Sequence, residues 1–562
     1  MTATDSTPAT KTSMYSTTST KPPAPPMSGP PEVPYKPFTL SFILVITSVY
    51  LAFFLIALDR MIIATAVPAI TNSFDSISDI GWYGSAYMLT CAIFNPLFGS
   101  IYKFYDTKWT FMFSVVIFEA GSAVCAAAPD SASFIVGRAV AGIGAAGISC
   151  GAIMIVIGLV PLHKRPVFTS FFGMAFGVSS VLGPVVGGIF TDSARLTWRW
   201  CFWINLPIGA FTLLVIFFFL SLPPPPPQKK AAAALPLLAK AKRLDPLGLL
   251  FFVPSIICLI LALQWGGTED AWSAPKIIGL LVTFAVLFIA FLIIEFKMPD
   301  TAMAPPRVVL NRSVGSSLFF TFMSSGGMMS AVYYLAIWLQ AAQGQSAMDA
   351  GIRMIPLVVS LVLFGIITAI FTQKIGYYVP ALLVAPIIAS VGAGMLSTLV
   401  PSSSRAAWMG YQILYGFGIG AGAQTASLAA QTVLPREDIP LGTAMGFFAQ
   451  QLGGAIFVPV GQNIFTSALV KRLSGVAGLD VTTIIDTGAT DLRKVVPTEE
   501  LSTVLDAYSY ASTRVFVLSA ALSACMMLGA LGVEWKSIKK AKPEAPKKVV
   551  DEEKGPTMGV GK

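Results

Sequence analysis

Apolar segments long enough to cross a lipid bilayer recur along almost the whole chain. A helix of about 20 residues spans ~30 Å of hydrocarbon. About fourteen segments of that length are present, at 40–66, 82–102, 109–127, 133–158, 168–190, 200–220, 246–264, 276–295, 314–338, 352–372, 379–400, 406–432, 441–468 and 513–533. Only 12% of the 562 residues are charged, against roughly 25% in a typical soluble domain. The sequence therefore predicts an all-α, polytopic membrane protein rather than a soluble domain with one anchor.

Basic residues alternate between the two sides of the predicted membrane. The turns after the second, fourth, sixth and eighth segments contain Lys103, Lys108, Lys164, Arg165, Lys229, Lys230, Lys240, Lys242, Arg243, Lys297, Arg307 and Arg312. Lysine and arginine are enriched in cytoplasmic turns, so this bias places both termini in the cytoplasm. It also accounts for the net charge of +9, which then gives no reason to expect a nucleic-acid partner.

Four polar stretches flank or interrupt the apolar segments. Residues 1–36 are rich in Ser, Thr and Pro, which favours a disordered cytoplasmic tail. Residues 221–245 combine a proline run with lysines, and we expect this linker to lie along the inner membrane face. Residues 471–512 are expected to form an outer, acidic loop, and 536–562 a basic cytoplasmic tail.

An internal repeat relates two parts of the chain. A shift of 274 residues superposes corresponding positions: Arg138 on Gln412, Gly142 on Gly416, Gly144 on Gly418 and Pro161 on Pro435. Many transporters are built from such repeats around a central site. The repeat predicts one six-helix bundle over 37–220, a second over 296–535, and two inserted membrane helices over 246–295.

Few ionisable residues interrupt the apolar segments. Asp59 and Arg60 lie in the first, Glu119 in the third and Arg138 in the fourth. At 1.5 Å per residue, Asp59 and Arg138 fall at comparable depth and can form a pair. Because a charge inside a membrane is costly, such residues often serve a proton or substrate pathway. We expect Asp59, with Arg138 and Glu119, to couple protons; a static salt bridge is the alternative. Arg60 either lines the cavity or extends its side chain outward.

The second half of the chain has aromatic and amide residues where the first has charges. The residues that we expect to line a substrate cavity are Tyr333, Tyr334, Trp338, Gln340, Gln412, Gln424 and Gln450. Such groups suit a large, mostly apolar ligand with a few hydrogen-bonding atoms. The alternative is that they seal contacts between helices.

A glycine–proline segment, GMAFGVSSVLGPVVGG at 173–188, lies inside the fifth apolar stretch. Glycines let membrane helices approach closely, and neighbouring helices satisfy the carbonyl that a proline frees. We expect close packing and bending at Gly177, Gly183, Pro184, Gly187 and Gly188.

The first apolar segment contains LDRMIIATAVPAI (58–70). It resembles the first-span motif of the fourteen-span drug:proton antiporters of the major facilitator superfamily. Asp59 and Pro68 stand at the key positions of that motif, whereas Met61 and Ala64 replace its usual Thr and Asn.

Two further segments strengthen the resemblance. IVGRAVAGIGAAG (135–147) is similar to the fourth-span motif of that family, and the segment at 173–188 is similar to its fifth-span antiporter motif. The likeness is greatest to fungal efflux pumps and covers about 36–535. It implies the major facilitator fold and the export of toxins, drugs or secondary metabolites in exchange for protons.

The turn at 99–109, GSIYKFYDTKW, departs from the family pattern. The resemblance implies a cytoplasmic gate formed here by Gly99, Lys103, Asp106 and Lys108. Lys103 stands where the family has an acidic residue, and Asp106 is the nearby acid that can replace it. The alternative is that only Gly99 and Lys108 of the pattern are kept and that the gate locks differently.

Several classes of activity lack the residues that they need. The chain has no Gly-x-x-x-x-Gly-Lys-Ser/Thr phosphate loop. Its single histidine, His163, excludes a polyhistidine metalloenzyme, and six cysteines do not make a disulfide scaffold. We expect no enzymatic activity, no cofactor and no bound metal.

The predicted function is proton-coupled export of small, mostly apolar organic compounds by alternating access. The alternatives are an importer or vacuolar carrier of siderophores or basic amino acids, and a non-transporting membrane sensor. The expected partners are a small-molecule substrate, protons and the lipid bilayer. We expect a monomer in the plasma membrane, with a vacuolar or vesicular membrane as the alternative.

Overall fold

The computed structural model describes residues 39–74, 76, 79–193, 195–222, 235–267, 270–299, 301–474, 496 and 500–539. These residues belong to one compact unit and form helices, with no strand longer than an isolated bridge. The expected tail at 1–36 lies outside the described residues. So do 223–234 of the linker, most of 475–499 in the expected outer loop, and 540–562 of the C-terminal tail.

The first six expected spans all coincide with helices. These are α1 (Leu40–Phe74), α2 (Ile80–Phe104), α3 (Thr107–Ala127), α4 (Ser131–Leu159), α5 (Arg165–Asp192) and the broken sixth span α6 (Trp200–Trp203) and α7 (Asn205–Phe219). The short helix η2 (Leu162–Lys164) precedes α5. Aspartates fix two of the helix starts, because Asp106 accepts from the amide of Lys108 and Asp130 from that of Ser133.

The two inserted helices follow the linker. They are α10 (Pro246–Trp265) and α11 (Pro275–Lys297), with the short α9 (Leu237–Lys242) before them. Asp245 caps α10 by accepting from the amide of Gly248 at 2.8 Å, and Pro246 occupies the first helical position. The helix α11 packs on α10, and α10 packs against α2 and against α18 (Ile439–Leu473).

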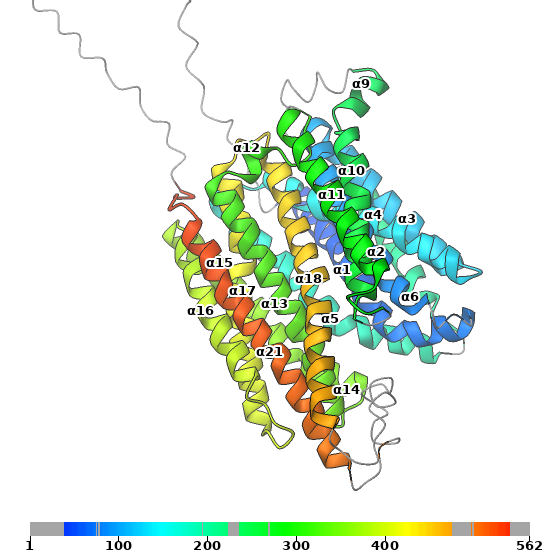
Figure 1. Ribbon diagram of the computed structural model, residues 1–562. Coiled ribbons are helices and arrows are strands. Elements are labelled where there is room, and N and C mark those ends of the chain that lie inside the picture. The colour runs from blue at the N-terminus through cyan, green and yellow to red at the C-terminus, as the bar shows by residue number, and fades with distance from the viewer. Residues whose placement is uncertain are drawn as a thin grey trace, which may run out of the picture. The chain divides into compact units, whose positions relative to one another are not determined.

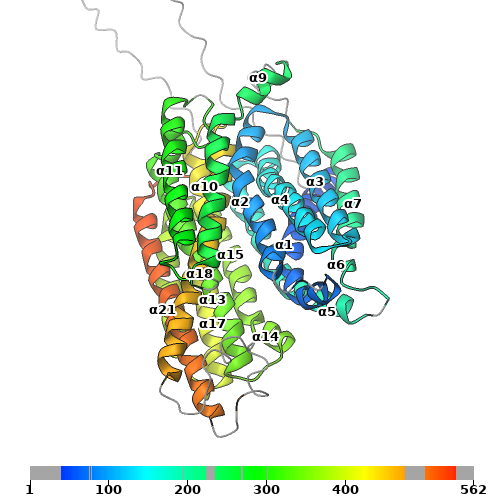
Figure 2. The ribbon, with the colours of Figure 1, turned by 45° about the vertical axis from the view of Figure 1, so that its right-hand side comes forward.

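The remaining helices form the second bundle. They are α12 (Pro306–Val309), α13 (Arg312–Ala341), α14 (Ala347–Arg353), α15 (Ile355–Ile375), α16 (Val379–Leu396), α17 (Arg405–Val433), α18 and α21 (Leu501–Gly532). Figure 1 shows α1–α7 in blue to cyan on one side and α13–α21 in green to red on the other. Figure 2 shows the same separation, with α10 and α11 beside α2 and α18.

Glycines that the 274-residue shift pairs make equivalent helix contacts. Each lies so close to a neighbouring helix that an added Cβ would overlap it. The contacts join Gly142 to Tyr87 of α2 and Gly144 to Phe118 of α3, and in the other bundle Gly416 to Leu357 of α15 and Gly418 to Ala389 of α16. Small residues permit such approaches between membrane helices. The fourth helix of each bundle is therefore packed in the same way.

Twelve helices of the described residues are long and apolar enough to cross a membrane. Two further helices, α2 and α17, coincide with the remaining expected spans. Glycine and polar residues lower the mean hydropathy of both. The structure is thus a polytopic helical membrane protein, and it is consistent with the predicted fourteen spans.

Candidate functional site

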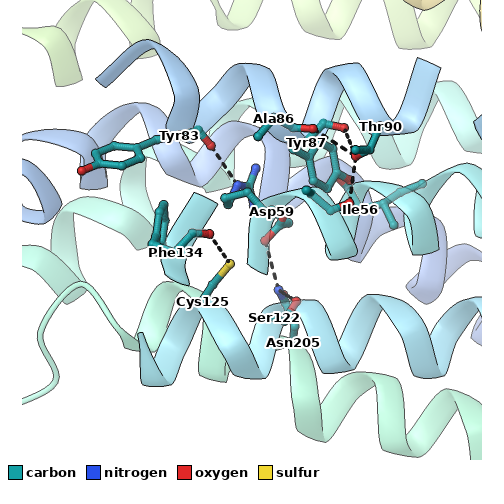
Figure 3. Close-up of polar contacts among 12 residues, drawn as sticks. Ile56, Asp59, Tyr83, Ala86, Tyr87, Thr90, Ser122, Cys125, Phe134 and Asn205 are labelled. Atoms are coloured by element: carbon teal, nitrogen blue, oxygen red, sulfur yellow. Dashed lines mark hydrogen bonds and ion pairs between the residues drawn. The ribbon is translucent and has the colours of Figure 1, made fainter. Parts of the chain in front are cut away.

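A buried ion pair joins α1 to α4, and Figure 3 shows its Asp59 with the surrounding Tyr83, Tyr87 and Asn205. Arg138 Nη1 lies 2.6 Å from Asp59 Oδ2, and neither side chain is more than 1% exposed. The depth estimate from the sequence predicts this contact, and the contact is present. A buried ion pair is weak evidence for a purely stabilising role, because removing both charges from water costs free energy.

Further polar groups complete the surroundings of the pair. Asn205, at the start of α7, donates to Asp59 Oδ1 at 3.3 Å and to Ser122 Oγ at 3.1 Å. Arg138 Nε donates to the carbonyl of Tyr83 at 3.0 Å. Asn205 was not predicted from the sequence, although an asparagine at the break between α6 and α7 is a usable signal.

The ring of Tyr87 lies against the same guanidinium. The central carbon of Arg138 is 4.5 Å from the ring centre, which is within the range of a cation–π contact. The Tyr87 hydroxyl donates to the carbonyl of Ile56 on α1 at 3.2 Å. The pair is therefore enclosed by helices α1, α2, α3, α4 and α7 of one bundle.

Glu119 is a separate acidic group of that bundle. Both of its carboxylate oxygens are shielded from solvent, and neither has a hydrogen-bond partner among the described residues. The carboxylate packs against Gly209 on α7, at a place that a Cβ would fill. The structure does not join Glu119 to the Asp59–Arg138 pair by a hydrogen bond.

The glycine–proline segment presents two packing faces of α5. A Cβ on Gly183 would lie 2.7 Å from Met61 Cβ on α1, and Gly187 lies against Thr65 of the same helix. Gly177 instead faces the other bundle, with Val362 of α15 2.7 Å from where its Cβ would be. Pro184 is within the helix, although its side chain lies outside what the structure describes. Gly188 has open space beside it.

The turn after α2 connects the two bundles by charge. Lys103 Nζ lies 2.8 Å from Asp438 Oδ1, with side chains only 12% and 6% exposed. Arg307 of α12 also binds Asp438, at 3.2 Å. Although burial raises the pKa of Asp438, the hydrogen bonds from Lys103 and Arg307 hold it below the usual value.

Asp106, the acid that the sequence offers in this turn, does not take part in this contact. Asp106 is engaged as the N-cap of α3, and the partner of Lys103 is Asp438, 335 positions away in the sequence. Lys108 stays within its own bundle and donates to the carbonyls of Phe217 and Leu220. A Cβ on Gly99 would lie 2.6 Å from Ala444, so α2 and α18 touch closely here.

The two bundles also pack together around the contact of Lys103 with Asp438, and we refer to this part of their interface as the Lys103 end. Buried residues of the first bundle, such as Tyr102 and Val156, belong to the same apolar cluster as Leu434, Leu441 and Ala444 of the second. Apolar burial of this kind contributes roughly 25 cal/mol per Å². The Lys103 end of the interface is therefore closed.

A cavity lies between the bundles, next to this closed end. It has about 1140 Å³ of unoccupied space, part of it open to solvent. Helices α1, α4 and α5 line one side, and α13, α15, α17 and α18 the other. The lining is mainly apolar and includes Phe53, Phe172, Phe176, Phe447, Gln424 and Gln450. No charged side chain is among its described lining residues.

Of the four glutamines that we expected to line the cavity, two do so and two do not. Gln424 and Gln450 face the space. Gln412 is fully buried in α17, and neither of its amide atoms has a hydrogen-bond partner in the described part of the chain. Gln340 lies near the end of α13, outside the lining.

The expected aromatic residues of α13 lie outside the cavity as well. Tyr334 donates to Gln462 at 2.9 Å, and Trp338 donates to Ser509 at 2.9 Å, so both join helices of one bundle. Tyr333 is 51% exposed. The phenylalanines that do line the cavity were missed because nothing in a chain with 39 phenylalanines distinguishes them.

Two helical bundles around one cavity, with ionisable residues buried inside a bundle, define a secondary membrane transporter. The chain belongs to the Major Facilitator Superfamily, whose family model matches residues 49–458. The fold and the family predicted from the sequence motifs are both confirmed.

Several curated relatives are similar over nearly their whole length. The chain is 47% identical over 506 residues to the MFS-type efflux pump MFS1 of Arthroderma benhamiae, covering 90% of this chain and 93% of the relative. It is 43% identical over 498 residues to the efflux pump aflT of Aspergillus parasiticus, covering 88% and 96%. It is 42% identical over 497 residues to the efflux pump roqT of Penicillium rubens, covering 88% and 91%.

Solved structures agree in fold. The human organic anion transporter MFSD10 matches with a TM-score of 0.54 at 16% identity, covering 86% of this chain and 99% of the other. The proton:xylose symporter XylE matches with a TM-score of 0.51 at 15% identity, covering 85% and 94%. At these identities the likeness concerns the fold alone.

Proposed function

We propose that this chain is a proton-coupled exporter of small, mostly apolar organic compounds that works by alternating access. The observation that carries the proposal is the cavity between the bundles, which is lined by aromatic, hydroxyl and amide groups and by no described charged side chain. Such a lining suits a drug-sized apolar compound. The names of the fungal relatives, which are efflux pumps, support the direction of transport.

Proton coupling is assigned to Asp59. In the present arrangement its charge is balanced by Arg138 and by the amide of Asn205. If rocking of the bundles separates Asp59 from Arg138, the carboxylate loses its counter-charge in a site of low polarity, and proton uptake neutralises it. Glu119 is the second proton site that we propose, because its buried carboxylate has no partner among the described residues.

The Lys103 end is proposed as the cytoplasmic gate. The basic turns favour the inner side for this end, and the contact of Lys103 with Asp438 lies across the two bundles. Opening toward the cytoplasm then requires breaking this ion pair and separating α2 from α18. Both termini are cytoplasmic in this proposal, and the protein acts as a monomer in the plasma membrane.

The cavity argues against the other candidate functions. A carrier of basic amino acids needs acidic groups for its cargo, and no carboxylate is among the described lining residues. A sensor needs no coupling between a proton site and a gate. Catalysis is not part of the proposal, since the family is one of transporters.

The coupling is tested with purified full-length protein in liposomes. An imposed pH gradient should drive movement of labelled aromatic compounds such as 2-naphthamide and 2-naphthoate. In Asp59→Asn the gradient-driven movement should disappear while exchange at equal pH remains, because a neutral side chain imitates the protonated state. Asp130→Asn, at an exposed helix cap, is the matched control and should behave as the parent.

Two results contradict the proposal. Unchanged gradient-driven transport in Asp59→Asn removes this residue from proton coupling. Deletion of the gene in the source organism tests direction, since an exporter's substrate must accumulate inside the cells and decline in the medium. The opposite distribution favours an importer.

A further inference from the structure

The single arginine of α1, Arg60, lies beside the cavity, and the proton-coupling scheme does not use it. Arg60 follows Phe53 by seven residues, so the two lie on the same face of α1. Phe53 lines the cavity. Asp59 precedes Arg60 by one position, points to a different face and is engaged with Arg138.

The contacts of Arg60 cross to the other bundle. Its Nη1 donates to Gln451 Oε1 at 3.0 Å, and its Nη2 lies 3.9 Å from the sulfur of Met329. Met329 is itself a lining residue of the cavity, and so is Gln450, the neighbour of Gln451. The guanidinium therefore stands at one edge of the substrate space.

This guanidinium has no acidic partner in the part of the chain that the structure describes. No carboxylate of the described residues lies within 4.0 Å of Arg60, and its Nε is shielded from solvent without a hydrogen-bond partner in that part of the chain. Arg138 of α4, by contrast, pairs with Asp59, and its Nε donates to the carbonyl of Tyr83. An amide oxygen and a thioether are weak substitutes for a counter-ion.

The positive charge of Arg60 therefore has no described negative partner inside a membrane-spanning helix. A positive charge in a membrane helix is costly unless a negative group or water compensates it. The cavity beside it has no described acidic or basic lining residue, so Arg60 is the dominant charge that a bound molecule meets. A ligand with one negative group would supply the missing counter-ion, and guanidinium is suited to bind a carboxylate through two hydrogen bonds.

We propose that Arg60 recognises an acidic group, a carboxylate or an ionised enol, on a substrate whose aromatic body fills the adjoining cavity. The inference rests on the proposed function of that cavity as the substrate site. In this arrangement the phenylalanines contact the aromatic body, and Gln450 is available to its neutral polar groups. On binding, the acidic group replaces Gln451 and Met329 as the partner of the guanidinium.

The test compares two ligands that share a body and differ in charge. Tritiated 2-naphthoate and 2-naphthamide are bound to the purified full-length protein at pH 7, where a carboxyl group is ionised. The parent should prefer the naphthoate. Arg60→Gln should lose about 10- to 100-fold in naphthoate affinity, the range for hydrogen bonds to charged groups, with little change for the amide. Arg60→Lys keeps the charge and should retain part of the preference.

Arg514→Gln is the matched control. It removes a guanidinium of α21 that contacts Tyr510 and does not line the cavity, and it should leave both affinities unchanged. Size-exclusion profiles and thermal unfolding check that every variant is folded. Equal affinities of the parent for the two ligands, no naphthoate binding by the parent, or an unchanged naphthoate affinity in Arg60→Gln overturns the proposal. An equal loss of affinity for both ligands in folded Arg60→Gln also overturns the proposal. That result would mean that Arg60 holds the two bundles together and does not recognise an acidic group.

A further variant separates this proposal from the proposed function. Ser324→Leu places a larger side chain in the cavity lining and should weaken binding of both ligands. If it does so while the parent does not discriminate by charge, the cavity remains the substrate site and only the role of Arg60 is lost. If both affinities are unchanged in Ser324→Leu, the cavity is not the binding site and both proposals fail.

Discussion

Replacing Lys103 by methionine should loosen the Lys103 end of the interface, and a native cysteine can report the change. Lys103 is bound to Asp438 of the other bundle at 2.8 Å. Cys150 of α4 is fully buried nearby, with its sulfur 3.9 Å from the carbonyl of Pro440 at the start of α18. Separation of the bundles at this end uncovers Cys150.

The magnitude follows from the contacts of Asp438. A hydrogen bond to a charged group contributes about 1.5–3 kcal/mol. Arg307 remains beside Asp438 in the variant, so the carboxylate is not left without a cation and the lower part of that range applies. A loss of about 1.5–2 kcal/mol from the closed arrangement raises the population with Cys150 exposed by about 10- to 30-fold.

The assay is the rate at which a water-soluble methanethiosulfonate reagent labels Cys150. The other five cysteines are replaced, and labelling is followed by mass spectrometry on protein in detergent. We expect Lys103→Met to be labelled about 10- to 30-fold faster than its parent, in proportion to the larger population with Cys150 exposed. Lys108→Met is the control, since Lys108 binds only carbonyls of its own bundle. Equal rates in parent and Lys103→Met, or equal acceleration by Lys108→Met, would refute the reasoning.

Three further predictions concern packing, the ion pair and pH. Gly418→Ala forces α17 away from α16 and should cost about 1–3 kcal/mol, seen as a lower unfolding temperature, whereas Gly410→Ala has open space and should be neutral or slightly stabilising. Asn205→Leu removes a donor to the Asp59 carboxylate and should slow gradient-driven transport about tenfold with ligand affinity unchanged; an unaltered rate contradicts the role of the amide. Hydrogen bonds hold the pKa of Asp438 below its usual value, against the effect of burial. The ion pair of Asp438 therefore stabilises the closed arrangement fully above the ordinary aspartate pKa of about 3.9. This stabilisation is lost only as pH falls through the lowered pKa of Asp438. Labelling of Cys150, corrected for its thiolate fraction, should therefore stay constant between about pH 5.5 and 8, and a steep rise within that interval would show that another group controls the gate.

The sequence predicts the helices and the pair inside one bundle well, because both depend on local information. Apolar length sets each span, and depth along α1 and α4 brings Asp59 to the level of Arg138. Equivalent glycines such as Gly144 and Gly418 identify the repeat, since a close approach between helices leaves few residue types to choose from.

Contacts between the bundles were harder to predict. Asp438 caps no helix by its side chain and lies in a turn with other charged residues, so nothing in the sequence marks it as the partner of Lys103. The residues that line the cavity are hard to predict for the same reason. Phe53 and Tyr333 are both aromatic residues of apolar helices, and only the packing of the two halves places one at the cavity and leaves the other exposed.

The two cations on Asp438 do not belong to the same half of the protein. Lys103 comes from the first bundle, whereas Arg307 and Asp438 both come from the second. If the halves part as proposed, Lys103 leaves but Arg307 stays beside Asp438, and the carboxylate keeps one cationic partner. On this proposal the gate opens without having to gain or release a proton. The proposed proton sites, Asp59 and Glu119, lie within the first bundle and are separate from the proposed gate, so a mutation that alters the number of protons moved per substrate need not alter the gate.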